Sequence, residues 1–538
     1  MDDSHVRSGI DLAPALPKSV EVLVVGYGPV GAALANLLGQ LGVAALVIDK
    51  SRGVFMAPRA IALDNEALRI LQMTGVKEGA FATVAIPFVR MLSPMFGEFA
   101  RFNTSGETDG HPKLVTFYQP ELERVLRGLV AQYANVSVAE GVELVDLTQT
   151  ADGVTANVRL ENGSMQEIKA DYLVGADGAS SKVRKLIGQE FKGQSFLQDW
   201  LIVDACGVEK PIDHVEFICD PKRPTPHMVA PCGRERWEFM LHKREEPRSM
   251  EADAKVEELL APWGGLSKLK IERKAVYRFH ARMVKEFSQG RVHMAGDAAH
   301  ITPPFVGQGL VAGLRDAANL AWKLAWVLRG RANPAILQSY NQERWHHAWS
   351  MIALARFMGA MVMPSNRLVA FVNHGTMRLL KSFPFFTELG MKPLPQFKTG
   401  LFASRRRGLA LCNGALVPQV WVRGGDGRIV LSDDALGNSL ALVGFGCNPS
   451  GTLSPAARAR FEAAGGRFVQ IAARGQHASV PGGGEVWEDL AGTLMPGRVQ
   501  RGWVAVVRPD KVVMANAPEG ETDALVAAAL GLLGEPGA

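Results

Sequence analysis

The chain has 538 residues, of which 47% are hydrophobic and 21% are charged. This length is too great for one hydrophobic core, so we expect roughly two to four domains of ordinary globular composition. Its 59 basic and 54 acidic residues give a formal net charge of +5 without a long basic block, which argues against a nucleic-acid-binding protein.

The cysteine content indicates a reducing compartment. Five cysteines are scattered along the chain, with no C-x-x-C pair and no spacing typical of metal ligands. The N-terminal segment is polar and carries no apolar signal sequence, and no apolar run reaches the roughly 18 residues that a membrane span requires. We therefore expect a cytoplasmic protein with neither a metal site nor a membrane partner.

The first predicted unit is a buried strand at residues 20–25, followed by a glycine-rich turn and a helix at residues 30–41. The turn carries Gly26, Gly28 and Gly31 in the pattern G-x-G-x-x-G. The first glycine allows a tight turn, the second lets backbone N–H groups approach a pyrophosphate, and the third lets the helix pack on the sheet. The pattern predicts a dinucleotide-binding unit.

A second apolar strand at residues 43–48 ends in Asp49. An acid placed roughly 20 residues after such a turn can accept hydrogen bonds from an adenosine ribose. Pro29 and Lys50 are neighbours of these motif positions and belong to the predicted site. The unit alone does not separate FAD from NAD, and the alternative is a glycine-rich turn in an unrelated α/β protein.

Two later segments again place an acid after an apolar strand. The segment DYLVGADG ends in Asp177 and Gly178, where Asp177, taken alone, could be a turn residue or a helix N-cap. The segment RVHMAGD ends in Asp297, ahead of a helical pattern that begins near Gly309. The small residues around both acids predict that main chain lies close to a ligand.

These three motifs, in this order and at these separations, resemble those of the FAD-dependent aromatic hydroxylases, the single-component flavin monooxygenases of the para-hydroxybenzoate hydroxylase type. The resemblance covers most of the chain. It implies an α/β fold in which a Rossmann-like FAD-binding domain carries an inserted mixed β-sheet substrate domain and a C-terminal thioredoxin-like domain.

The resemblance implies roles for individual residues. The glycine-rich turn and Asp49 would hold the ADP half of FAD, and Asp297 would hold the ribityl chain. Residues 307–309 would face the pyrimidine edge of the flavin, where the next helix offers its positive dipole end to a reduced flavin. Asp177 and Gly178 would support both FAD and the reduced nicotinamide. The predicted cofactor-binding residues are Gly26, Gly28, Pro29, Gly31, Asp49, Lys50, Arg59, Gln119, Asp177, Gly178, Asp297, Pro304, Gly307, Gln308 and Gly309.

The resemblance also divides the chain into domains. We expect an FAD-binding domain from residues 18–80, 112–190 and 285–350, a substrate domain from 81–111 and 191–284, a helical connection over 351–404, and a thioredoxin-like domain over 405–538. The last domain lacks C-x-x-C, and Cys447 stands alone in it. We therefore expect a structural module, or one that joins two chains in a homodimer, without redox activity.

The segments PRAIALDNEALRILQ and GNSLALVGFGCNP are most similar to the 3-(3-hydroxyphenyl)propionate hydroxylase branch. This implies that NADH or NADPH reduces FAD, that O2 forms a flavin C4a-hydroperoxide, and that a phenolic substrate is hydroxylated ortho to its hydroxyl group in aromatic catabolism. No second G-x-G-x-x-G occurs, so the nicotinamide would bind transiently. The loop at residues 304–306 reads PFV where that branch often carries tryptophan, which leaves the phenol open.

Four residues on predicted strands of the substrate domain are candidates for contact with the phenol. His227, Tyr277 or His280 could help to deprotonate its hydroxyl group. Arg282 could pair with a substrate carboxylate. For each residue, the alternative is a structural or surface role.

The proline-rich loop before the last motif provides two further candidates for the catalytic pocket. Pro304 and Phe305 would border the ring-binding side, with Phe305 as an apolar wall whose truncation leaves stability nearly unchanged. His300, in GDAAH, is expected to hold the loop instead of acting as a base.

Three alternatives to this function stay open at the level of sequence. The protein could hydroxylate another phenol, such as a resorcinol-like compound or a polyketide. It could be a flavin oxidase or reductase that inserts no oxygen. It could also be a binding module that recruits a partner through its C-terminal domain, although three intact cofactor motifs argue against this.

Overall fold

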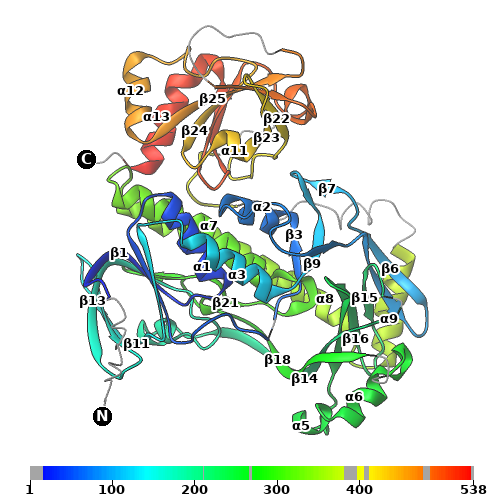
Figure 1. Ribbon diagram of the computed structural model, residues 1–538. Helices are drawn as coiled ribbons and strands as arrows, with labels where there is room; N and C mark the ends of the chain where they lie inside the picture. The colour runs from blue at the N-terminus through cyan, green and yellow to red at the C-terminus, as the bar shows by residue number, and fades with distance from the viewer. Residues whose placement is uncertain are drawn as a thin grey trace, which may run out of the picture.

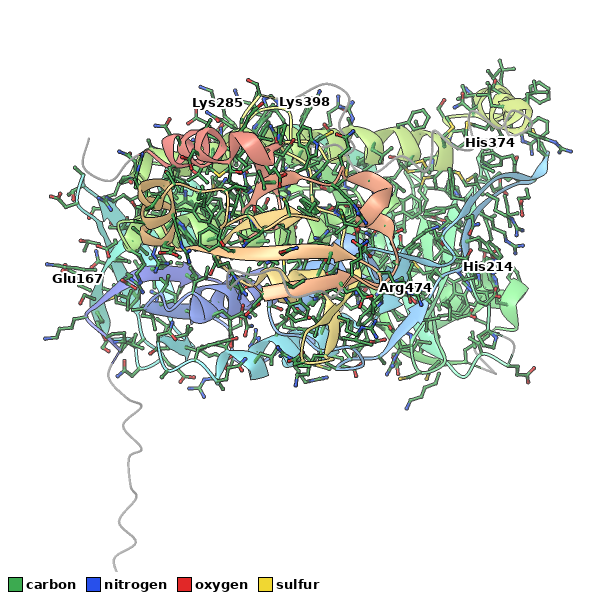
Figure 2. All side chains as sticks on the ribbon, turned by 90° about the horizontal axis from the view of Figure 1, so that it is seen from above. Glu167, His214, Lys285, His374, Lys398 and Arg474 are labelled. Atoms are coloured by element: carbon green, nitrogen blue, oxygen red, sulfur yellow. The ribbon has the colours of Figure 1, made fainter. Side chains whose placement is uncertain are left out.

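The computed structural model describes residues 16–57, 59–209, 211–265, 269–380, 397–404, 411–476 and 485–534. Two large sheets lie side by side, and a C-terminal α/β domain is stacked on the helices of the first (Figure 1). Seen from above, His214 and His374 mark the end of the molecule that the C-terminal domain leaves uncovered (Figure 2).

The first sheet is built on the apolar runs that precede the motifs. Its strands are β1 (Ser19–Val25), β2 (Ala45–Asp49), β10 (Val136–Glu140), β11 (Glu143–Gln149), β12 (Val154–Arg159), β13 (Met165–Gly175), β19 (Ser288–Gln289) and β20 (Val292–Met294). Their order is β10-β2-β1-β13-β12-β11, with β20 and β19 beside β13. β10, β2, β1, β13 and β20 run parallel, so the ends of β1, β2, β13 and β20 bring the three motifs to one edge.

Helices pack against one another and onto this sheet. They are α1 (Pro29–Gln40), α3 (Gln119–Val130), α4 (Lys182–Leu186), α7 (Gln308–Leu328) and α8 (Gln338–Val362). α7 crosses the molecule between α1 and α8 (Figure 1) and is buried on almost every side. Because so little of α7 faces water, each polar side chain on it needs a partner inside the protein.

The second sheet is broad and mostly antiparallel. Its strands are β5 (Phe88–Ser93), β6 (Gly97–Asn103), β14 (Lys192–Cys206), β15 (Val215–Ile218), β16 (Thr225–Ala230), β17 (Arg234–Met240), β18 (Lys270–Met283) and β21 (His300–Ile301). Their order is β21-β18-β14-β17-β16-β15-β5-β6. Through β21, which belongs to the late motif, this sheet is joined directly to the loop that carries Asp297.

The two faces of the second sheet bury different apolar clusters. The helices that cover them are α5 (Pro247–Met250), α6 (Asp253–Leu260) and α9 (Arg367–Leu380), together with α8. On β14, Trp200 and Ile202 pack toward α8, α9 and the turn at residues 304–306, whereas Leu201 and Val203 pack against α5 and α6. We call the first of these the inner face and the second the outer face.

A small sheet connects the two large ones. Its elements and neighbours are β3 (Ala62–Asp64), α2 (Asn65–Met73), β4 (Thr83–Ala85), β7 (Glu107–Thr108), β8 (His111–Pro112) and β9 (Leu114–Phe117). The order of this sheet is β3-β9-β4, and β7 and β8 form a separate hairpin. Asp64 ends β3 and caps α2 by accepting from the Ala67 amide at 2.8 Å.

The C-terminal domain is a mixed sheet with helices on it. Its elements are β22 (Trp421–Gly424), β23 (Ile429–Leu431), α11 (Ser432–Leu436), β24 (Leu440–Phe445), α12 (Pro455–Ala463), β25 (Gly466–Ala473), β26 (Glu485–Asp489), β27 (Trp503–Val507), β28 (Val513–Pro518) and α13 (Thr522–Leu533). The order is β23-β22-β26-β25-β24-β27-β28, with β24, β25 and β26 parallel and β27 and β28 antiparallel. Burial raises the pKa of the Cys447 thiol to about 12, so this thiol is a poor nucleophile near neutral pH.

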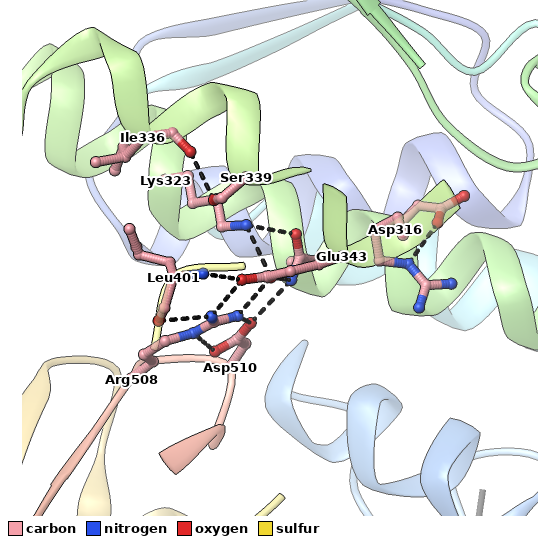
Figure 3. A network of polar contacts seen from close by, with 10 residues as sticks. Asp316, Lys323, Ile336, Ser339, Glu343, Leu401, Arg508 and Asp510 are labelled. Carbon is pink, nitrogen blue, oxygen red and sulfur yellow. Dashed lines mark hydrogen bonds and ion pairs between the residues drawn. The ribbon is translucent and has the colours of Figure 1, made fainter. Parts of the chain in front are cut away.

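A buried network of charges joins the C-terminal domain to α7 and α8 (Figure 3). The Glu343 carboxylate accepts from Arg508 at 2.7 and 2.9 Å and from Lys323 at 2.9 Å. Asn319 donates to the same carboxylate at 2.6 Å, and Asp510 balances the charge of Arg508. Burial alone would raise the pKa of Glu343, but Arg508 and Lys323 outweigh it and hold that pKa far below its usual range. Removing one member would leave the others buried without compensation.

Within the described ranges, no helix combines the length and the apolar character that a membrane crossing requires.

We expect Glu343→Gln to lower the free energy of unfolding by about 3–5 kcal/mol, because Arg508 and Lys323 would keep their buried charges without the carboxylate. Denaturant unfolding measures this change. Glu462→Gln is the matched control, since Glu462 pairs with Arg458 on an exposed helix face and should contribute little. Equal midpoints for the two variants would contradict the role assigned to the network.

Candidate functional site

The glycine-rich turn is shaped by close approaches of backbone. Gly26 has a φ of +107°, and a side chain there would meet the Ala176 carbonyl oxygen at 2.4 Å. A side chain at Gly31 would meet the Gly26 oxygen at 2.0 Å. At Gly28, by contrast, a Cβ would have no described atom within 4 Å, and α1 begins directly afterwards at Pro29. The helix N-terminus therefore faces open space of the kind that a phosphate group fills.

Asp49, at the end of β2, organises the same turn. Its carboxylate accepts from the Tyr27 amide at 2.7 Å and from the Ser51 amide at 2.8 Å. Lys50, the next residue, points into solvent. A carboxylate has about four lone-pair positions, so Asp49 can also accept from a ribose hydroxyl.

A cavity of about 450 Å³ lies near Asp49. Glu140, which lines it, is the residue of β10 that lies opposite Asp49 of β2 in the sheet. The lining residues of the cavity are Tyr27, Arg52, Arg127, Val138 and Glu140. The Arg127 guanidinium lies 4.5 Å from the Tyr27 ring centroid and pairs with Glu140 at 2.5 Å. The cavity thus presents guanidinium and carboxylate groups that can form hydrogen bonds with an adenosine moiety.

Gln119, Arg59 and Asp297 are brought together from three separate segments. The Gln119 side-chain oxygen accepts from the Arg59 and Ala60 amides, each at 2.9 Å, and so holds that loop. The Arg59 guanidinium lies 3.9 Å from the Asp297 carboxylate. Surrounding atoms raise the pKa of Asp297, with Arg59 and His300 acting in the opposite direction, yet 37% of its side chain stays accessible. The carboxylate is therefore held in place and open to a ligand.

The loop that carries Asp297 is fixed by residues that the motif analysis missed. Asp316, fully buried on α7, accepts from the Gly296 amide at 2.9 Å and binds the His300 ring at 2.7 Å. The Arg344 guanidinium donates to its other oxygen at 2.8 Å. The expectation that His300 holds the loop is confirmed. The missed signal was a charged residue inside an otherwise apolar helical pattern.

The N-terminus of α7 is reached through a left-handed residue, Gly307, whose φ is +64°. A side chain at Gly309 would meet only the Thr302 oxygen, at 4.0 Å, so the main chain here is accessible. The Gln308 side chain donates to Asp64 at 2.9 Å and accepts from Arg315 at 2.6 Å. Gln308 therefore ties α7 to β3 with its side chain, and only its main chain remains for a cofactor.

Asp177 caps a helix with one carboxylate oxygen and leaves the other oxygen available for a ligand. One oxygen caps α4 by accepting from the Lys182 and Val183 amides at 2.6 and 3.1 Å. The other oxygen is buried without a hydrogen-bond partner in the part of the chain that the structure describes. Burial raises the pKa of this carboxyl group. Next to it, Gly178 has a φ of +76° and open space around its α-carbon.

Phe305 packs on the inner face of the second sheet. Its ring centroid lies 5.9 Å from those of Trp200 and Phe279, and a side chain at Gly359 would meet the ring at 2.9 Å. Phe305 follows Pro304 and is only 3% exposed. The residue belongs to the substrate-domain cluster, and its contacts are those of a core side chain, so the structure favours a loss of stability on truncation over the sequence-based expectation of no change.

His227 lies on the outer face of the second sheet, opposite to the face that carries Tyr277 and Phe305. It stacks on Trp237 at 4.8 Å on the outer face, away from Phe305. Its two ring nitrogens bind Glu216 at 3.0 Å and Glu235 at 2.6 Å. Burial lowers the pKa of His227, but the two carboxylates outweigh burial and raise it. Because both of its ring nitrogens are engaged by carboxylates, the geometry favours a structural role for His227.

His280 and Arg282 also lie on the face of β18 opposite to Tyr277 and Phe279, because residues alternate along a strand. Both bind the Ser195 hydroxyl, His280 at 3.0 Å. Burial, followed by Arg282, lowers the pKa of His280. The structure therefore separates these two candidates from the inner face, whereas Tyr277 remains on it.

A charged cluster on the inner face was not singled out in the sequence. We call it the roof cluster: Asp204 on β14, Arg236 and Glu238 on β17, and Arg273 and Tyr277 on β18. Arg236 binds Asp204 through two hydrogen bonds of 2.6 and 3.0 Å, and Arg273 lies 3.4 Å from the same carboxylate. The signal was present in RERWEFM, where charged residues alternate with tryptophan and phenylalanine and so share one face of a strand.

Within the described ranges, no group of three His, Cys, Asp or Glu side chains is arranged to hold a metal ion.

The chain matches two family models. Residues 19–355 match an FAD binding domain, and residues 414–531 match the HcaD C-terminal domain. A protein of Burkholderia vietnamiensis named 3-(3-hydroxy-phenyl)propionate/3-hydroxycinnamic acid hydroxylase 2 is 35% identical over 92% of this chain and 93% of its own length. A Klebsiella pneumoniae hydroxylase of the same name, without the final number, is 34% identical over 94% and 93%.

Solved structures share the whole fold. The flavin-dependent monooxygenase PieE, in complex with FAD and substrate, has a TM-score of 0.81 at 21% identity, with 97% of this chain and 100% of that chain covered. Aklavinone-11 hydroxylase, with FAD and aklavinone, has a TM-score of 0.75 at 22% identity, with 95% and 99% covered. These likenesses show that the arrangement of domains is common to both.

The residues at the edge of the first sheet fit FAD. The open backbone at Gly28 suits a pyrophosphate, and the cavity beside Asp49 suits an adenosine. Asp297 and the unpaired oxygen of Asp177 are acceptors for hydroxyl or amide groups. The accessible main chain at Gly309 suits the edge of a flavin ring.

Asp297→Ala should weaken the binding of FAD at least tenfold, since it removes a charged acceptor worth about 1.5–3 kcal/mol. The fold should persist because the contact of Asp297 with Arg59 is long, at 3.9 Å. Titration of the apoprotein with FAD, followed by flavin fluorescence, measures the affinity. Asp152→Ala, an exposed aspartate on a turn of the same domain, is the control. Unchanged affinity in Asp297→Ala would disprove the assignment.

Phe305→Ala should lower the free energy of unfolding by about 3–5 kcal/mol, because it leaves a cavity between Trp200, Phe279 and α8. Thermal and denaturant melts measure the loss. Phe357→Ala on α8 is the control, as its ring is 55% exposed and should contribute little. A melting temperature equal to that of the wild type would contradict the core role of Phe305 and favour the role of a pocket wall that stability does not require.

Proposed function

Because the chain belongs to the FAD-dependent aromatic hydroxylases, as the match over residues 19–355 and the 35% identity over 92% of its length show, it is a flavoprotein monooxygenase of aromatic compounds. We propose that it hydroxylates a phenol that carries a carboxylate side chain, such as 3-(3-hydroxyphenyl)propionate, ortho to the hydroxyl group. NADH or NADPH is the proposed reductant and O2 the oxidant.

One observation carries the choice of substrate class. The relatives named for 3-(3-hydroxyphenyl)propionate are similar along both the FAD-binding part and the C-terminal domain, with 93% of their own length covered. The similarity therefore includes the second sheet, which supplies the roof of the ring-binding site. A relative that shared only the cofactor motifs would not support a substrate.

When bound, FAD supplies the redox chemistry, taking electrons from the nicotinamide and activating O2. In the proposed reaction, the N-terminus of α1 at Gly28 binds the pyrophosphate, and Asp49 binds the ribose. Asp297 binds ribityl hydroxyls, and the N-terminus of α7 stabilises negative charge at the near edge of the flavin. These residues would hold the cofactor so that its reactive ring can meet a substrate at the inner face of the second sheet.

The chain also has to keep water from the reacting ring. Trp200, Phe279 and Phe305 form an apolar wall on the inner face, beside the turn that precedes α7. A phenol ring bound beside this wall would be shielded from water, so that activated oxygen is used on the ring and is not lost as hydrogen peroxide. Tyr277 lies in the same cluster and brings a hydroxyl group to it.

We also propose a cytoplasmic location and a structural or dimerising role for the C-terminal domain. Among the described residues no disulfide bond joins any of the five cysteines, which supports a reducing compartment. The raised pKa of Cys447 supports a domain without thiol chemistry.

We expect one atom of labelled O2 to appear in the product when the FAD-loaded protein turns over 3-(3-hydroxyphenyl)propionate with NADH or NADPH. The new hydroxyl group should be ortho to the existing one, because that oxygen donates electron density to its ortho position. Mass spectrometry and product NMR measure label and position. 3-Phenylpropionate, which lacks the hydroxyl group, should stimulate little nicotinamide oxidation. Label that came from water would favour an oxidase, and turnover confined to a larger phenol would favour a different substrate.

A further inference from the structure

Glu238 stands out among the charged residues of the inner face. Its side chain is 6% exposed, and among the described residues its carboxylate has neither a hydrogen bond nor an ion pair. Asp204, on the neighbouring strand, is by contrast bound by Arg236 and lies near Arg273. A buried carboxyl group without a partner is costly, so its presence needs a reason other than stability.

The groups around Glu238 set its protonation near neutral pH. Burial raises the pKa of Glu238 to about 7, Arg236 and Arg273 oppose this rise, and Asp204 adds to it. Asp204 lies on β14, Arg236 on β17 itself, and Arg273 and Tyr277 on β18. Glu238 can thus accept and release a proton in the range where an ordinary glutamate stays ionised.

The roof cluster lies between the two loops that flank the predicted flavin position. On one side, Arg236 donates to the Arg59 carbonyl oxygen at 3.1 Å, and Arg59 lies beside Asp297. On the other side, Tyr277 packs in the same apolar cluster as Phe305, in the turn before α7. A phenol held against the inner face would therefore have its ring near Phe305 and its polar edge near the roof cluster.

The charges of the cluster favour a hydroxyl group over a carboxylate. Arg236 and Arg273 are balanced by Asp204 and Glu238, so the cluster is neutral when both acids are ionised. A substrate carboxylate placed here would be a third negative charge and would be repelled by the two acids. A phenolic hydroxyl brings no charge and can donate its proton to the one carboxylate that lacks a partner.

We propose that Glu238 accepts the proton of the substrate's phenolic hydroxyl group, while Tyr277 and Arg273 hold the same oxygen. This inference rests on the proposed function. The O–H bond of the phenol breaks as an O–H bond forms on Glu238, and the electron pair left on the oxygen activates the ortho carbon. Once the ortho carbon carries an oxygen atom derived from O2, that carbon loses its hydrogen to solvent as a proton, and Glu238 returns its proton to the ring oxygen.

Glu238→Gln tests this proposal, because it keeps the shape of the side chain and removes the proton acceptor. In the FAD-loaded wild type, kcat/KM for 3-(3-hydroxyphenyl)propionate should rise with pH through about 7, where Glu238 loses its proton. The variant should lose this limb and fall roughly 100-fold or more in kcat/KM. For a ring-fluorinated analogue with a more acidic hydroxyl group, the substitution should lower kcat/KM by a smaller factor, since this substrate needs less help from a base.

Two further variants separate a proton acceptor from a structural role. Glu238→Asp keeps the carboxylate and should restore part of the rate and the pH limb. Glu272→Gln removes a carboxylate of the same strand, β18, which is paired with Arg234 at 2.6 Å and stands outside the roof cluster, and this variant should behave as the wild type. FAD affinity and melting temperature should be preserved in Glu238→Gln, because no hydrogen bond of the described residues is broken.

The outcomes distinguish this proposal from the proposed function. If the wild type forms hydroxylated product and Glu238→Gln keeps its pH limb and rate, the role of Glu238 is wrong and the function stands. If Glu238→Gln lowers kcat/KM by the same factor for the parent and the fluorinated substrate, Glu238 positions the substrate and takes no proton. If the wild type hydroxylates no phenol, the proposed function fails, and the role of Glu238 fails with it.

Discussion

Asp316 lies fully buried in the middle of α7 and binds three groups at once: the Gly296 amide, the His300 ring and the Arg344 guanidinium. Burial alone would raise the pKa of Asp316, but His300 and Arg344 outweigh it and keep the carboxylate ionised. Through these contacts the loop that presents Asp297 is fixed to the same helix whose N-terminus is proposed to face the flavin. The geometry of the cofactor site therefore depends on one helix and on the partners of its buried charges.

The second sheet uses its two faces for different purposes. The outer face is closed by α5 and α6, and its buried histidine, His227, is fully engaged by two glutamates. The inner face combines an apolar wall with a cluster of charges in which Glu238 alone has an unengaged carboxylate among the described residues. The buried polar groups of His227 are thus fully paired on the outer face, whereas the inner face, which is the proposed ligand-binding face, keeps a carboxylate without a partner among the described residues.

The residues proposed to hold the cofactor were named from the sequence because they follow strand ends that the chain itself marks. Gly26 and Asp297 are each recognised from a few neighbouring positions, and a parallel sheet brings those strand ends together. The residues of the roof cluster were harder to identify from the sequence. Alternation along β18 already implied that Tyr277 and His280 cannot share a face. Which face meets the cofactor, and hence the importance of Glu238, depends on packing between segments far apart in the chain.

The charge network around Glu343 has a consequence for how the protein can be divided. Arg508 and Asp510 come from the C-terminal domain, yet they complete a polar cluster inside the helices of the first domain (Figure 3). A fragment that ended before the C-terminal domain would expose Lys323 and Glu343 to water and lose the guanidinium that binds both oxygens of Glu343. The two domains therefore share one buried polar network, and we expect that the FAD-binding domain cannot be excised, or fused to another C-terminal domain, without loss of stability.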